Sequence, residues 1–300
     1  MALWIPVTLA AAAFQTARFM LQKVLSSARL SPAGATFARF AYSAPLILIG
    51  LAAYLWVTGR GLPPLSGRFW LFAVIGGTAQ ILATICVVAL FKQRNFAVGI
   101  TFKKTEVIQT ALVGLVVLGD RISPGGWVAI LLGLVAVLVL SRAPNSDGAW
   151  WRHLTNRAAG LGLGSGVLFA FSAVGYRGAT LQLTDPDPVF RAGVTLACVV
   201  TFQMVAMGLW MVWRDRDELR AVWAARRTAV FVGLTSMGGS FCWFLAFTLQ
   251  NAAYVKALGQ VELILSLMAS VLVFRERITA REIAGMGLLG LSILALVLAI

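Results

Sequence analysis

Ten apolar segments of about twenty residues each dominate the sequence and limit what it can fold into. A helix of about 20 mostly apolar residues crosses a bilayer core about 30 Å thick. The segments that we expect to span are 3–24, 34–57, 69–91, 96–118, 124–141, 158–178, 188–213, 228–249, 252–274 and 280–299. They are much longer than the alternating strands of a membrane barrel. The sequence therefore predicts an all-α integral membrane protein with ten transmembrane helices. Because no charged region precedes the first segment, we expect it to be a mature helix rather than a cleaved signal peptide.

The composition supports this class and argues against several others. Of the 300 residues, 60% are hydrophobic and only 12% are charged, whereas about a quarter of the residues in a soluble domain are charged. The net charge of +14 does not indicate nucleic-acid binding, because the basic residues punctuate apolar runs instead of covering one polar face. Such residues are typical of the flanks of membrane helices. We expect the lipid bilayer as a partner and no nucleic acid.

Metal, cofactor and enzyme chemistry find no support in the sequence. His153 is the single histidine and lies in a polar connector, and Cys86, Cys198 and Cys242 lie in separate apolar segments without metal-site spacing. A Walker sequence is absent, and so is a Ser, His and Asp set for nucleophilic catalysis. We therefore expect no cofactor, no metal and no enzymatic activity.

An internal duplication becomes visible when the sequence is aligned with itself at an offset of 156 residues, which places DRIS at 120–123 on ERIT at 276–279. Six identical pairs share this offset: Gly77 and Gly233, Cys86 and Cys242, Phe91 and Phe247, Asn95 and Asn251, Glu106 and Glu262, and Arg121 and Arg277. We expect two five-helix repeats, 1–145 and 146–300. An odd number of spans turns the second copy upside down in the membrane. Transporters with such inverted repeats hold their substrate near the midplane, between the halves.

Two acidic side chains, Glu106 and Glu262, fall inside the apolar runs, and they are repeat partners. Each precedes the acidic residue of its DRI or ERI turn by 14 residues, which is about 21 Å along a helix. A carboxylate at that depth should face the bundle interior, because exposure to lipid is costly. Each could carry a proton or bind an amino group of a solute. Each could equally be structural, hydrogen-bonded to a neighbouring helix or, for Glu106, paired with Lys103 one turn away.

Basic and polar residues complete the expected cavity. We take Arg18, Lys103, Lys104 and Lys256 as candidates to attract an anionic or carboxylate-bearing solute. Three further arginines lie near expected helix ends and are expected to reach the headgroups: Arg39, Arg177 and Arg191. The polar and aromatic candidates for solute contact are Gln80, Trp243 and Gln260, with Gln15, Tyr176 and Tyr254 as weaker ones.

The segments TEVIQTALVGLVVLGDRIS and VELILSLMASVLVFRERIT, each followed by a Gly-rich apolar helix, resemble the paired signature of the EamA-like transporters of the drug/metabolite transporter superfamily. That signature contains an acid before a proline, then a Gly-Glu-Arg turn. The matching residues are Glu106 and Glu262 for the first acid, Asp120 and Glu276 for the second, and Arg121 and Arg277 for the arginine. Val107 and Leu263 stand where the family has proline. The resemblance implies ten helices, a central cavity and alternating access, in members that mostly export amino acids and other small metabolites. Relatives move nucleotide sugars or sugar phosphates.

These observations predict a secondary active transporter of a small polar metabolite, either amino acid-like or an anionic organic solute. Protons are the candidate coupling ion. One alternative is a facilitative exchanger of phosphorylated or carboxylated metabolites, and a non-transport alternative is a membrane scaffold subunit. We expect a monomer or weak dimer in a bacterial inner membrane.

The orientation in the membrane is predicted from the distribution of lysine and arginine. Most connector Lys and Arg follow the odd-numbered expected helices, which by the positive-inside rule makes those connectors cytoplasmic and both termini external. The resemblance implies the opposite, since the family usually has cytoplasmic termini.

Overall fold

The computed structural model describes residues 2–28, 30–90, 102–141, 157–274 and 279–299. Within these ranges the chain is helical and contains no strand. Six helices in this part are long and apolar enough to cross a membrane, and two shorter apolar helices cover 106–118 and 124–140. The expected all-α membrane class is confirmed. The count of ten spans is not, because part of the fourth expected span, 96–101, lies outside the described residues and the ninth is broken.

The first half of the chain forms α1 (Trp4–Ala28), α2 (Pro32–Thr58), α3 (Gly67–Leu90), α5 (Glu106–Leu118) and α6 (Pro124–Ser141). Local chemistry sets the ends of α2. The side chain of Ser31 caps its start by accepting a hydrogen bond from the Gly34 backbone N–H, and Pro32 occupies the first turn. Gly59 ends the helix with a φ of 64°, a left-handed conformation that favours glycine.

The second half forms α7 (Arg157–Leu181), α8 (Pro188–Arg214), α9 (Arg216–Ala224), α10 (Arg226–Leu249), α11 (Ala252–Leu258), α12 (Val261–Phe274) and α13 (Ala280–Leu298). The sequence did not predict α9, which lies in the expected connector 214–227. This short helix is strongly amphipathic, with Val222 buried and most of its other residues partly or fully exposed. Asp215 caps it by accepting a hydrogen bond from the Glu218 backbone N–H.

The expected continuous helix 252–274 is broken, which corrects the sequence prediction. α11 ends at Leu258 and α12 starts at Val261. A Cβ on Gly259 would lie 2.5 Å from the Trp243 ring, so the break packs tightly against α10. The first half has a matching feature, because a turn at Thr105 directly precedes α5. Discontinuous membrane helices of this kind surround substrate sites in transporters.

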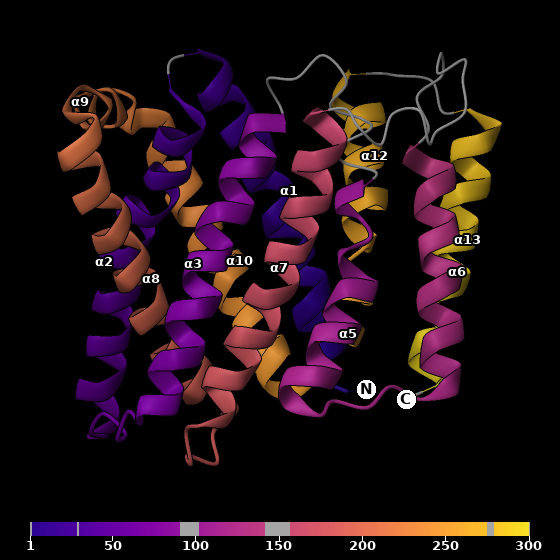
Figure 1. The fold of residues 1–300 in the computed structure, drawn as a ribbon, viewed down its shortest axis with the longest axis horizontal. Coiled ribbons are helices and arrows are strands. Elements are labelled where there is room, and N and C mark those ends of the chain that lie inside the picture. The colour runs from indigo at the N-terminus through magenta and orange to yellow at the C-terminus, as the bar shows by residue number, and fades with distance from the viewer. Residues whose placement is uncertain (1, 29, 91–101, 142–156, 275–278, 300) are drawn as a thin grey trace.

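The long helices lie side by side, and both termini lie at one edge, which we call the terminal edge (Figure 1). The connectors after α2, α5 and α7 also lie there, whereas α9 lies at the opposite edge. As a result α2 runs toward the terminal edge and α8 away from it, and α3 and α10 are likewise opposed. Corresponding helices of the two halves therefore run in opposite directions.

Contacts between the halves are reciprocal. α3 packs mainly on α7, and α1 packs mainly on α10, so the third long helix of each half covers the first helix of the other. α6 packs on α13 and α2 on α8, each on its own counterpart. This is the pattern that a two-fold axis between the halves produces.

The helix bounds repeat at the offset found in the sequence. Adding 156 to the bounds of α5 gives 262–274, which coincides with α12 except for one residue, and adding it to those of α6 gives 280–297, within α13. Of the matched pairs, those that include Phe91, Asn95 or Arg277 involve a residue outside the described ranges.

Candidate functional site

The two breaks place Glu106 and Glu262 at the starts of half-helices inside the bundle. Glu106 is the first residue of α5 and is only 4% exposed, and Glu262 is the second residue of α12. The positive end of the helix dipole favours a carboxylate at this position. Both glutamates therefore face the interior, as the cost of exposing them to lipid led us to expect.

Ion pairs link these glutamates across the two halves. Lys256 Nζ lies 3.7 Å from Glu106 Oε1, and Lys104 Nζ lies 3.8 Å from Glu262 Oε2. Lys103 Nζ adds a contact of 3.7 Å to Glu106 Oε2 within the first half. Glu106 Oε2 accepts no hydrogen bond among the described residues. At Oε2, charge attraction rather than hydrogen bonding thus holds the Glu106 carboxylate. Both Lys103, the structural partner expected from the sequence, and Lys256 of the other half lie within ion-pair distance of Glu106.

Aromatic rings and one amide surround the lysines. The Phe169 ring lies 5.2 Å from the ammonium groups of both Lys103 and Lys256, and the Trp243 ring lies 5.0 Å from Lys256. These are distances at which a ring face attracts a cation. Trp243 Nε1 donates to Gln15 Oε1 at 3.1 Å, and Gln15 Nε2 donates to a Glu262 oxygen at 2.7 Å. Gln15 therefore connects Trp243 to the buried acid of the second half.

Two buried arginines lie beside this charged group, and for one of them, Arg39, the sequence prediction was wrong. Arg39, which we expected to reach the headgroups, is 2% exposed. Its guanidinium donates to the hydroxyls of Ser236, Thr84 and Ser240 at 2.7, 3.3 and 3.1 Å. Arg18 is 4% exposed and donates to Gln15 Oε1 at 3.4 Å.

The two candidate glutamines occupy different surroundings. Gln80 Oε1 accepts hydrogen bonds from the Tyr176 hydroxyl at 2.8 Å and from Gln203 Nε2 at 3.0 Å. Gln260 is buried and lines a separate small space with Lys104 and residues of α6 and α13. Gln80 therefore shares a cavity with the arginines, whereas Gln260 does not.

One small cavity joins most of these groups. Its lining includes Arg18, Arg39, Gln80, Trp243 and Lys256. The cavity volume is about 20 Å³, which leaves room for about one water molecule. The site is thus too small in this conformation to admit a metabolite. We call the group of Glu106, Glu262, Lys103, Lys104, Lys256, Arg18 and Arg39 the central charge cluster.

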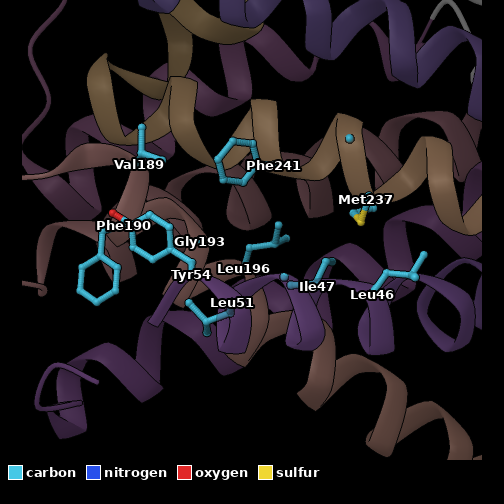
Figure 2. Close-up of a pocket in the computed structure, with 12 residues that line it drawn as sticks. Leu46, Ile47, Leu51, Tyr54, Val189, Phe190, Gly193, Leu196, Met237 and Phe241 are labelled. Carbon is cyan, nitrogen blue, oxygen red and sulfur yellow. The ribbon is translucent and has the colours of Figure 1, made fainter. Parts of the chain in front are cut away.

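A larger cavity of about 330 Å³ lies between α2, α8 and α10, and it is apolar. Figure 2 shows Tyr54 and Phe190 at one end and Leu46 and Met237 at the other, with Leu196 between them. Hydrocarbon would fit such a space, but it offers no charge to recognise a polar metabolite. The central charge cluster is therefore the better candidate for a solute site, despite its smaller volume.

Bonds between the halves also close the terminal edge. Arg177, a further arginine that we expected to reach the headgroups, donates to the two carboxylate oxygens of Asp120 at 2.8 and 3.3 Å. It also donates to the backbone oxygens of Phe247 and Gln250 at 2.9 and 2.7 Å. The Tyr54 hydroxyl binds Asp187 at 3.1 Å. Separation of the halves at this edge would require the Arg177–Asp120 and Tyr54–Asp187 bonds to break, because these are the ones that join the halves.

The structure brings in polar residues that sequence reasoning missed or ranked low. Arg39, Gln203 and the hydroxyl pair Ser236 and Ser240 were not selected, and Tyr176 was ranked as a weaker candidate. The sequence does carry a signal for the serines, because Ser236 and Ser240 are four residues apart and so lie on the same face of a helix. Arg39 lies two turns into α2, and the sequence alone does not reveal that its partner hydroxyls lie on α3 and α10.

The model of the EamA-like transporter family matches the chain twice, over residues 2–142 and 156–298. A solved structure titled only "Crystal structure of protein" has a TM-score of 0.72 and 15% sequence identity, and the alignment covers 98% of this chain and 99% of the other. That likeness concerns the fold alone. No curated protein matches the sequence. Because the family model covers nearly the whole chain in two copies, the protein belongs to the EamA-like transporter family.

Proposed function

We propose that the protein is a secondary active transporter of a small polar metabolite, amino acid-like or anionic, that works by alternating access. The solute would bind at the central charge cluster while the halves 1–145 and 146–300 rock against each other. Opposed helix directions, reciprocal contacts and the shared offset of 156 support two inverted repeats. We further propose that it resides in a bacterial inner membrane as a monomer or weak dimer.

One observation carries this proposal: the buried ion pairs Lys256–Glu106 and Lys104–Glu262 each join one half to the other. Ionised groups inside a membrane protein are costly, and they commonly mark the path of a solute or proton. Here they lie where the two moving units would meet. A solute that competes for these lysines or glutamates would weaken the link between the halves, which is how binding would be coupled to movement.

The test is transport by purified protein in vesicles. Vesicles loaded with one amino acid, organic acid or phosphate ester at a time would be assayed for uptake of the labelled form of the same compound. We expect at least one class to be exchanged by the wild type and lost or uncoupled in Glu106→Gln. The matched control is Asp217→Asn, an exposed acid on α9. Wild-type uptake by Glu106→Gln would rule out the role of this carboxylate, and exchange of no compound would favour a scaffold subunit.

A second candidate, facilitative exchange without proton coupling, is favoured by the lysine partners of both glutamates. A carboxylate engaged with an ammonium group is a poor proton acceptor until that pair separates. Uptake driven by a pH gradient alone would support proton coupling. Uptake that requires a counter-solute and ignores the gradient would support exchange.

A further inference from the structure

The buried charges between the halves do not balance. Five basic side chains are at most 8% exposed: Arg18, Arg39, Lys103, Lys104 and Lys256. The lysines are within ion-pair distance of Glu106 or Glu262. Neither Arg18 nor Arg39 has an ion-pair partner among the described residues. In the described part of the chain, the five positive charges therefore exceed the two carboxylates by three, and the two arginines are the cations with no carboxylate within ion-pair distance.

These two charges do not depend on pH, because a guanidinium group stays protonated in proteins. Hydroxyl groups satisfy much of Arg39, but hydroxyls carry no negative charge. Arg18 is less well satisfied, since its Nε is buried and has no hydrogen-bond acceptor. A buried cation with an unused donor is expensive unless a counter-charge arrives.

Both arginines line the same small cavity as Lys256. The remaining wall contains five aromatic side chains: Phe169, Tyr176, Trp243, Phe244 and Phe247. Cations beside flat apolar rings suit a ligand that has an anionic group and an apolar part.

Building on the proposed transport function, we propose that Arg18 and Arg39 form an anion site and that the solute is an organic anion. Its carboxylate or phosphate-type group would bind the two guanidinium groups, and its apolar part would pack on the aromatic wall. An amino acid-like solute would bind through its carboxylate, with Glu106 or Glu262 left for its amine. A purely cationic amine would be rejected.

The experiment measures the electrostatic potential in the cavity with charged thiol reagents, so the solute need not be known. Ser172 lines the cavity and is 2% exposed, and serine to cysteine is a small change. In the full-length protein with Cys86, Cys198 and Cys242 replaced by alanine, Ser172→Cys would be labelled by matched anionic and cationic thiol reagents. Each rate is divided by the rate with a free thiol. Both reagents reach the cysteine only when the cavity opens. The ratio of their labelling rates therefore reports the charge of the cavity and not how often it opens.

We expect the anionic reagent to react about tenfold faster or more, as fields of this sign concentrate counter-ions. The ratio should fall toward one in Arg39→Gln and in Arg18→Gln. It should persist in Arg39→Lys, which keeps the charge, and in the exposed control Arg220→Gln. Normal labelling with a ratio near or below one would overturn the anion site while leaving an aqueous transport path intact. Failure of both reagents to label any variant would overturn the anion site and the proposed transport path together.

Discussion

Removal of the Glu106 carboxylate should be among the most damaging single changes to the stability of this protein. In Glu106→Gln, Lys103 and Lys256 lose a carboxylate that lies 3.7 Å from each ammonium group. At an effective dielectric constant near 20, each contact corresponds to roughly 4.5 kcal/mol of gross attraction. Desolvation offsets much of this attraction, so the gross value overstates the net contribution. The loss of one partner from a buried pair costs about 3–5 kcal/mol, because the charge left behind has no counter-charge.

A double-mutant cycle tests the magnitude. Glu106→Gln, Lys256→Met and the double variant would be compared by equilibrium unfolding in mixed micelles. We expect Glu106→Gln to lower the free energy of unfolding by about 3–5 kcal/mol, and Lys256→Met to lower it less, since Lys103 still partners Glu106. The coupling energy should be favourable, about 1–3 kcal/mol.

The control for this cycle is Asp217→Asn, whose side chain is 87% exposed and paired with Arg220. An exposed pair of this kind contributes at most about 1 kcal/mol. A coupling energy near zero between Glu106 and Lys256, or equal destabilisation by Glu106→Gln and Asp217→Asn, would refute the reasoning from buried charge.

Three other predictions concern the protein away from the central charge cluster. Gly175→Ala should destabilise the protein by about 1–3 kcal/mol, because the new Cβ would lie 2.8 Å from Gly76 Cα. The control is Gly164→Ala on the same helix, which has open space around it and should be neutral or stabilising. Equal thermal unfolding temperatures for the Gly175→Ala and Gly164→Ala variants would disprove the close α3–α7 contact. Arg177→Lys keeps the charge but loses the bidentate contact with Asp120, so a cysteine introduced near the terminal edge should react with a thiol reagent faster than in the wild type. Arg220→Lys is the control. An unchanged labelling rate would show that Arg177 does not hold that edge. A reporter enzyme fused to the C-terminus should work only outside the cytoplasm, and activity of a cytoplasm-dependent reporter instead would reverse the orientation.

Periodicity and the repeat predicted much of the architecture. Long apolar runs require spanning helices whatever their neighbours are, so the helix positions followed from local sequence. The inward direction of Glu106 and Glu262 followed from the cost of a carboxylate in lipid. Both arguments needed only the chain itself and the bilayer.

Other features depended on contacts between distant helices and could not be read from the sequence. The break at Gly259 lies against Trp243 of α10, where a side chain would not fit, while hydrophobicity alone favoured one continuous helix. Arg39 looked like a headgroup anchor because it lies two turns from a helix start, yet the hydroxyls of Thr84, Ser236 and Ser240 bury it. α9 was missed because a nine-residue charged segment lacks the apolar run that marks a span.

In the proposed mechanism, two inverted halves open a shared charged site to each side of the membrane in turn. Its most direct test is the sidedness of labelling at Ser172→Cys in vesicles of uniform orientation, with a membrane-impermeant thiol reagent supplied either outside or inside. Reagent supplied from either side should label the cysteine. Labelling from one side alone, or from neither side, would contradict alternating access.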